Sequence, residues 1–233
     1  MRSRKHYKNP QKAKYKILHK DNEIVVVDKP AGLLTVPIPR IKAVNLEYLL
    51  NKQLDPQNSE IQAAHRIDRY TSGIVVFARN RKAHRNLMMQ FRNHTPDRVY
   101  LAIVRGCPTK KEDILKHHMK RVKQGFRNIV VPASDEEGTQ ARLRYVVLQP
   151  GEEKSLVKIF LDTGLKNQIR VQFAEIGHPL VGDRHYSSKE KFNSNLDRQA
   201  LHAAELTFDH PATGERVTFL SDLPKDLKFE LKS

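Results

Sequence analysis

The chain has 233 residues, of which 39% are hydrophobic and 29% are charged. Lys and Arg number 42 against 26 Asp and Glu, so the formal net charge is +16. This length allows a sizeable core, and the excess of positive charge favours a nucleic acid partner over a surface of merely solvated lysines. A single cysteine, Cys107, excludes an intramolecular disulfide and any zinc site built from several thiolates.

The N-terminal region is basic and lacks the apolar run of a signal peptide. No segment is apolar over a membrane-spanning length, so we expect a cytoplasmic protein without a membrane partner. Residues 1–20 contain eight Lys/Arg and no acidic residue. They either lie along a phosphate backbone or form a solvated tail. We expect residues 1–16 to be a basic arm and residues 17–233 to be one domain.

The first half of the chain predicts strands alternating with helices. The expected elements are a buried strand at 23–28, a proline-rich loop at 29–40, a helix at 45–54, a strand at 74–78 and a helix at 80–93. In the last helix Ala83, Leu87, Met88 and Phe91 form one apolar stripe. Met88 and Met89 are therefore expected to fill the core.

A strand at 99–106 is followed by a strongly basic region. Residues 105–127 hold few apolar positions, which indicates an exposed excursion from the core. Cys107 is expected to be a small packed residue. His117 and His118 stand side by side, but no carboxylate or thiol lies at a suitable spacing, so no metal site is expected.

The second half of the chain predicts strands at 141–149 and 155–162 and two more strands joined at 211–214. Ile169, Phe173 and Ile176 recur at helical spacing, so a helix is expected from near Asn167 to Gly177. Strand pairs with scattered helices, and no repeat or linker, predict one α+β domain.

The stretch HRIDRYTSG, from His65 to Gly73, places Asp68 between Arg66 and Arg69 just before a strand. The carboxylate could belong to a salt-bridged turn. It could also be a nucleophile held ionised beside a phosphate-binding surface, since a nearby arginine lowers a carboxyl pKa. The residues of this stretch alone leave both readings open.

Five segments together resemble the RluA-type pseudouridine synthase family. In family order they are IVVVDKPAGLLTVP, HRIDRYTSG, VYLAIVRG, TGLKNQIRVQFAEIGHPLVGDRHY and RQALHAAELTFDHPATGE, and they extend from about residue 17 to the C-terminus. The resemblance implies a bent, mixed, mostly antiparallel sheet with flanking helices and a central catalytic cleft. It also implies isomerisation of specific uridines in RNA to pseudouridine, with no metal and no other cofactor.

The resemblance assigns roles to individual residues. Asp68 matches the catalytic aspartate, Tyr100 the tyrosine that stacks on the base and takes part in removing the C5 proton, and Arg170 the arginine that pairs with the aspartate. By its residues alone, Arg170 could equally be a surface arginine opposite Ile169 and Phe173. Arg66 corresponds to the arginine that fills the space left by a flipped uridine. His65 and Arg69 are further RNA candidates, and the supporting motif residues are Thr71, Ser72, Gly73, Gln168 and Ile169.

One segment departs from the family pattern. Where the family has TGRTHQIR, this chain has Leu165, Lys166 and Asn167 after Thr163-Gly164. The change motivates an alternative, a homologue that binds RNA without modifying it. In either case the expected partner is ribosomal or transfer RNA, no nucleotide cofactor is involved, and the chain is expected to be a monomer.

Overall fold

A computed structural model describes residues 14–39, 41–58, 60–122, 127–187, 194 and 196–232. Residues 1–13 of the expected basic arm lie outside this part of the chain. The chain divides into two compact units, one formed by Met1–Pro96 and Leu206–Ser221, the other by Asp97–Glu205 and Asp222–Ser233. We call them unit 1 and unit 2. The single catalytic domain expected for residues 17–233 stays a prediction.

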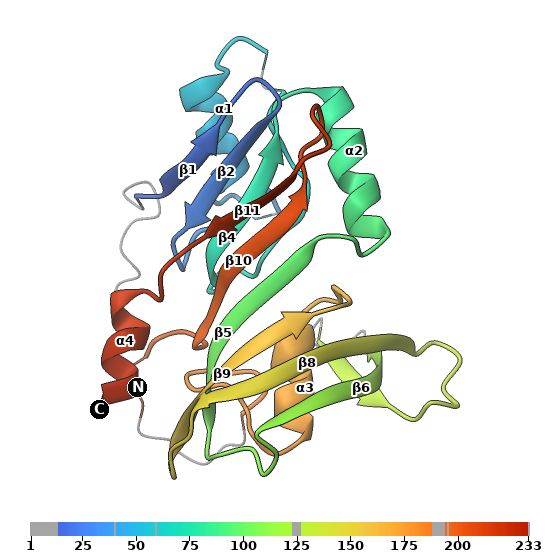
Figure 1. Cartoon of the computed structure of the whole chain (residues 1–233), viewed down its shortest axis with the longest axis vertical. Helices are drawn as coiled ribbons and strands as arrows, with labels where there is room; N and C mark the ends of the chain where they lie inside the picture. Colours follow the sequence, from blue (N-terminus) through green and yellow to red (C-terminus); the bar gives the residue numbers. More distant parts are fainter. Residues whose placement is uncertain are drawn as a thin grey trace. The chain divides into compact units, whose positions relative to one another are not determined.

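Unit 1 is built on a sheet in which β1 and β2, β2 and β4, and β3 and β4 pair antiparallel (Figure 1). Its strands are β1 (Lys16–Lys20), β2 (Ile24–Lys29), β3 (Gln62–Ala63), β4 (Ser72–Ala78) and β11 (Arg216–Leu220), together with the last residues of β10 (Leu201–Asp209). β1 pairs with β2, β2 with β4, β4 with β10, and β10 with β11, while β3 pairs with β4. The unit has two helices, α1 (Leu46–Leu54) and α2 (Arg81–Arg92).

The core of unit 1 follows from the β-branched content of β2 and β4. Ile24 and Val26 on β2, with Val76 on β4, share a face that Ala83 and Leu87 of α2 cover. Both helices begin at an asparagine, as is common at helix N-termini. Asn45 accepts from the backbone N–H of Tyr48 in α1, and Asn80 accepts from that of Ala83 in α2.

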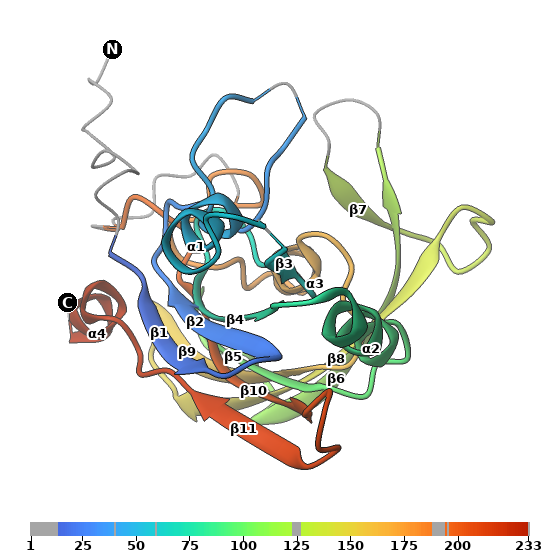
Figure 2. The same ribbon diagram turned by 90° about the horizontal axis from the view of Figure 1, so that it is seen from above.

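Unit 2 contains strands in the order β10–β5–β9–β8–β6–β7. The strands are β5 (Asp97–Arg105), β6 (Glu112–Arg121), β7 (Asn128–Val131), β8 (Thr139–Gln149) and β9 (Lys154–Leu161), and the helices are α3 (Gln168–Glu175) and α4 (Lys225–Lys232). Every pair from β5 to β7 is antiparallel. Helix α3 lies on one side of β8 and β6 (Figure 2), where the Phe173 ring meets that of Tyr145. The α+β class expected from the sequence is confirmed.

Three expectations from the sequence are wrong. The region 105–127 is not an excursion, because β6 occupies much of it and buries Leu115 and Met119. Met88 and Met89 are 42% and 57% exposed, so they do not fill the core. Cys107 is exposed rather than packed.

None of the described helices has both the length and the apolar character to span a bilayer.

Candidate active site

In unit 1, Asp68 lies in the loop between β3 and β4 and is half-buried. Its carbonyl accepts a hydrogen bond from the backbone N–H of Thr71 at 3.0 Å, which closes a turn. Thr71 and Ser72 are buried, and Gly73 has a φ of 112°, a conformation that glycine adopts without strain. Thr71 therefore ends the loop, and Ser72 and Gly73 are the first residues of β4.

A buried lysine connects this loop to the segment that follows β2. Lys29 is fully buried, and its Nζ donates to the carbonyls of Pro30 at 3.0 Å, Leu33 at 2.8 Å and Arg69 at 3.2 Å. Burying an ammonium group is unfavourable unless the group is hydrogen-bonded. The three carbonyls therefore determine where Lys29 Nζ lies. Lys29 thus holds residues 30–33 against the residue that follows Asp68.

Further hydrogen bonds join the same two segments. The Gly32 N–H donates to the Arg69 carbonyl at 2.7 Å, and Arg69 Nε donates back to the Gly32 carbonyl at 2.9 Å. Buried Thr35 donates through Oγ1 to the Ile67 carbonyl at 3.0 Å and accepts from the Ile67 N–H at 3.4 Å. The backbone on both sides of Asp68 is therefore held by the KPAGLLT segment.

The three RNA candidates of unit 1 differ in their surroundings. Arg66 is exposed. The ring of His65 stacks on Phe91 with centroids 4.4 Å apart, and its Nε2 accepts from the Val76 N–H at 3.2 Å. Arg69 also places its guanidinium 5.4 Å from the centre of the Tyr70 ring. His65 and Arg69 thus support the loop, whereas Arg66 extends from it.

In unit 2, Arg170 is buried on α3, so the reading as a surface arginine is wrong. Its Nε and Nη2 donate to the two carboxylate oxygens of Asp183 at 2.6 and 2.9 Å. Burial alone would raise the pKa of Asp183. The hydrogen bonds and charge of Arg170, with the N–H groups of His185 and Tyr186, instead hold this pKa below its usual value.

The segment that departs from the family pattern is integrated into unit 2. Asn167 has a positive φ of 58°, accepts from Arg170 Nη1 at 3.1 Å and donates to the Tyr186 hydroxyl at 3.1 Å. The Tyr186 ring centre also lies 5.1 Å from the Arg170 guanidinium carbon. Leu165 packs against the cluster of Met119, Ala141 and Val171. Asn167 therefore helps to orient Arg170.

Two buried glutamines fix the start of α3. Gln168 accepts from Thr163 Oγ1 at 2.8 Å and donates to the Gln172 side chain at 3.0 Å. Gln172 in turn donates to the Leu115 carbonyl at 3.2 Å. Ile169, between Gln168 and Arg170 in the sequence, is also buried. The role of motif support expected for Gln168 and Ile169 is consistent with these contacts.

Tyr100 lies on β5, paired with Ile159 of β9, and is 8% exposed. Two residues before it, Arg98 donates through Nη2 to the Asp162 carbonyl at 2.7 Å. Burial lowers the pKa of Arg98, while the nearby Tyr100 and Asp162 act in the opposite direction. The guanidinium group of Arg98 therefore lies near Tyr100 on the same strand.

The candidate residues thus fall into two groups. Unit 1 carries Asp68 with Arg66 on one loop, and unit 2 carries Tyr100 and Arg170. Periodicity and charge spacing gave no sign of Lys29, Asp183 or Gln172. All three nevertheless lie inside the motif segments that resemble the family.

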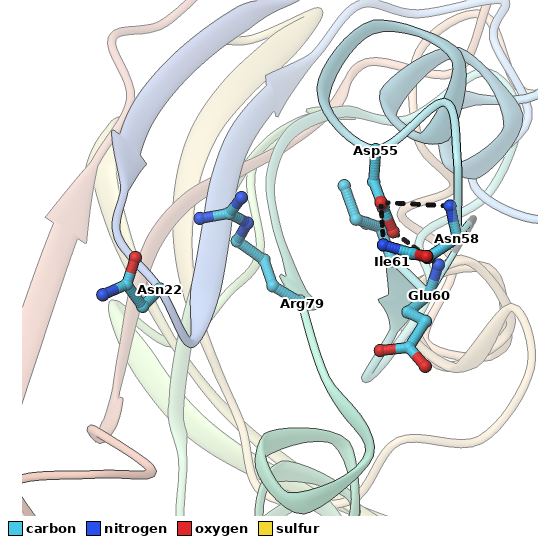
Figure 3. Close-up of a pocket in the computed structure, with 6 residues that line it drawn as sticks. All are labelled: Asn22, Asp55, Asn58, Glu60, Ile61 and Arg79. Atoms are coloured by element: carbon cyan, nitrogen blue, oxygen red, sulfur yellow. Dashed lines mark hydrogen bonds between the residues drawn. The ribbon is translucent and has the colours of Figure 1, made fainter.

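A pocket in unit 1 lies apart from these residues. It is lined by Asn22, Asp55, Asn58, Glu60, Ile61 and Arg79 (Figure 3). Asp55 is occupied by local hydrogen bonds, from Asn58 Nδ2 at 3.2 Å and the Glu60 N–H at 2.8 Å. Among the described residues, no group of three or more His, Cys, Asp or Glu side chains could hold a metal ion.

A family model described as RNA pseudouridylate synthase matches residues 23–175, a range that contains Asp68, Tyr100 and Arg170. The chain belongs to this family: it is an RNA pseudouridine synthase, an isomerase that acts on RNA.

Curated relatives span most of the chain. The dual-specificity RNA pseudouridine synthase RluA of Salmonella typhimurium is 36% identical over 219 residues, covering 91% of this chain and 95% of the relative. The ribosomal large subunit pseudouridine synthase D of Zymomonas mobilis is 33% identical over 242 residues, covering 97% and 74%. The solved human RNA pseudouridylate synthase domain containing 4 is similar in fold, with a TM-score of 0.77, 22% identity and coverage of 93% and 91%.

Proposed function

We propose that this enzyme converts specific uridines of ribosomal or transfer RNA to pseudouridine, with Asp68 as the nucleophile. The observation that carries the proposal is the loop around Asp68, whose backbone is held on both sides by Lys29, Gly32 and Thr35. A catalytic group gains from such fixed placement because the reacting atoms are then held in position. The relatives named for ribosomal and dual-specificity activity support the choice of RNA class.

The chemistry requires one bond to break and another to form. The N1–C1′ bond of uridine breaks with the Asp68 carboxylate holding the sugar, the freed base rotates, and C5 joins C1′. C5 then loses its proton and N1 gains one, so no cofactor is consumed. In this proposal Tyr100 stacks on the base and takes part in removing the C5 proton, and Arg170 is the partner of Asp68.

A uridine inside a stack is out of reach of such a carboxylate, so it must be flipped out. The exposed side chain of Arg66, two residues from Asp68, is suited to fill the space that the base leaves. We further propose that residues 17–233 act as one catalytic domain and that the protein works in the cytoplasm as a monomer.

The alternative of an RNA-binding homologue without activity rested on residues 165–167. The contact of Asn167 favours the active enzyme, because its side-chain oxygen accepts a hydrogen bond from the buried Arg170.

The test is release of tritium from ribosomal and transfer RNA transcripts labelled at C5 of uridine. We expect release by the wild type and at least a 10³-fold slower rate for Asp68→Asn, roughly the loss seen when a nucleophile is removed. Asp222→Asn, which changes an exposed carboxylate of unit 2, is the matched control and should keep the wild-type rate. Absence of release from every transcript would refute the proposed substrates. Equal rates for the wild type and Asp68→Asn would refute the role of Asp68.

A further inference from the structure

Helix α2 presents one exposed face that the proposed chemistry does not use. Its inner side is fixed, because Ala83 and Leu87 are buried in the core of unit 1 and Phe91 packs against that core. Gln90 makes two hydrogen bonds with the backbone of Asp209, at 2.7 and 2.9 Å. These contacts set the rotation of the helix about its axis and hence the direction in which its outer face points.

The outer face is a single stripe of basic and methionine side chains. Its members are Arg81, Lys82, Arg85, Met88, Met89 and Arg92, which are all the exposed residues of α2. Their spacing of i, i+1, i+4, i+7, i+8 and i+11 places them on one side of a helix with 3.6 residues per turn. We call this set the α2 stripe.

The positive charge of the α2 stripe is not compensated locally. Helix α2 contains no acidic residue, and within the described residues none of the four basic side chains forms an ion pair. The carboxylates next to the helix are engaged elsewhere. Glu23 accepts from Asn80 at 2.9 Å, and Asp209 pairs with Arg216 at 3.1 Å. The stripe is therefore suited to an anionic partner.

We propose that the α2 stripe binds the phosphate backbone of the substrate RNA on one side of the target uridine; this inference rests on the proposed function. Arg81 and Arg85 are about 6 Å apart along the helix axis, so their guanidinium groups can reach successive phosphates. Met88 and Met89 offer polarisable apolar surface between the cations, against which a ribose or base can pack.

The position of α2 within unit 1 supports this partner. Phe91 stacks on His65, which lies three residues before Asp68 on the same loop. The helix is thus joined to the loop that carries the proposed nucleophile. RNA held on the stripe would pass near that loop. An exposed helix with four basic groups and no acid fits a polyanion better than an ordinary protein surface.

The test compares two double variants that remove the same charge from exposed helix residues. Arg81→Gln/Arg85→Gln alters the stripe, and Lys225→Gln/Lys228→Gln on α4 is the matched control. Binding of ribosomal and transfer RNA transcripts is measured from 0.05 to 0.5 M salt, a range chosen to bracket about 0.1 M. For the stripe variant we expect affinity about tenfold lower at about 0.1 M salt and a log–log salt slope shallower by about 1.4, since two phosphate contacts are lost. The control variant should match the wild type.

Tritium release from C5-labelled transcripts at saturating RNA separates this inference from the proposed function. Unchanged affinity and slope in the stripe variant would overturn the inference, even when release shows that the enzyme is active. An equal loss in both double variants would also overturn it, because the effect would then reflect net charge alone. Weaker binding by the stripe variant, with no release by the wild type, would support the stripe while refuting the proposed substrates.

Discussion

At the scale of single residues, two buried charges are satisfied in different ways. Lys29 in unit 1 donates to backbone carbonyls and therefore fixes chain segments. Arg170 in unit 2 makes a two-point ion pair with Asp183, which fixes a side chain. The first arrangement places the loop of Asp68. The second holds the arginine that we propose acts on it.

The ion pair predicts a dependence of stability on pH. Because the folded state lowers the pKa of Asp183, its contribution is fully present above the unfolded value of about 3.9 and is lost as pH falls through the lower folded value. Asp183→Asn removes the charge and leaves Arg170 buried without it. We expect this variant to lose about 3–5 kcal/mol of unfolding free energy near pH 7.

Urea unfolding between pH 7 and pH 3 checks this prediction. The difference between the wild type and Asp183→Asn should narrow below about pH 4, because Asp183 then takes up a proton in the unfolded wild type while it is still ionised in the folded state. Asp197→Asn serves as the control, since Asp197 is 70% exposed and pairs with the equally exposed Arg184. A difference that stays constant down to pH 3 would contradict the assigned pKa shift.

At the scale of elements, the segment from α3 to Asp183 depends on two glycines with positive φ. Gly177 ends α3 with a φ of 82° and has open space where a side chain would begin. Gly182, next to Asp183, has a φ of 74°, and a Cβ there would lie 2.0 Å from the Arg198 carbonyl oxygen. Both conformations are costly for other residues, but only Gly182 also lacks room.

Gly182→Ala should therefore be much more damaging than Gly177→Ala. We expect about 1 kcal/mol for Gly177→Ala from the backbone conformation alone. For Gly182→Ala we expect about 3 kcal/mol or more, because the backbone must also shift away from Arg198. Thermal or urea unfolding of the two variants measures the contrast. Equal losses would show that the close approach at Gly182 relaxes without cost.

Sequence patterns located the elements whose period was clear. The helix starts at Asn45 and Asn80 and the apolar strands β2 and β4 were all predicted correctly. Strand β6 was missed because Asp113 and His117 share its inner face with Leu115 and Met119, which hides the alternation. Strand β1 was hidden by the basic composition around it, and β7, with four residues, is too short to show a period.

At the candidate site, the contacts that the sequence does not reveal depend on tertiary packing. Motif resemblance identified Asp68, Tyr100 and Arg170, whose roles stay predictions. It did not reveal that Asp183 is a carboxylate partner of Arg170, because the two are separated by a turn whose path depends on tertiary packing. The exposure of Met88 and Met89 likewise depends on which side of α2 meets the sheet. The helical period alone does not decide this.

At the scale of the whole molecule, the net charge of +16 is spread over several segments. The α2 stripe is one of them. The sequence before β1 is another, since residues 2–13 hold the five basic residues Arg2, Arg4, Lys5, Lys8 and Lys12 and no acid. Counterion release makes each basic residue that contacts a phosphate visible in the salt dependence of RNA binding.

Deleting residues 2–13 distinguishes an RNA-binding arm from a solvated tail. If the arm lies along the backbone, we expect the log–log salt slope to become shallower by about 2–3, because several phosphate contacts are lost. Tritium release at saturating RNA should stay at the wild-type rate, since Asp68, Tyr100 and Arg170 are untouched. Replacing the five basic residues by Gln at constant length is the matched control for chain length and should give the same slope as the deletion. A slope equal to that of the wild type in both variants would assign RNA binding to the rest of the chain.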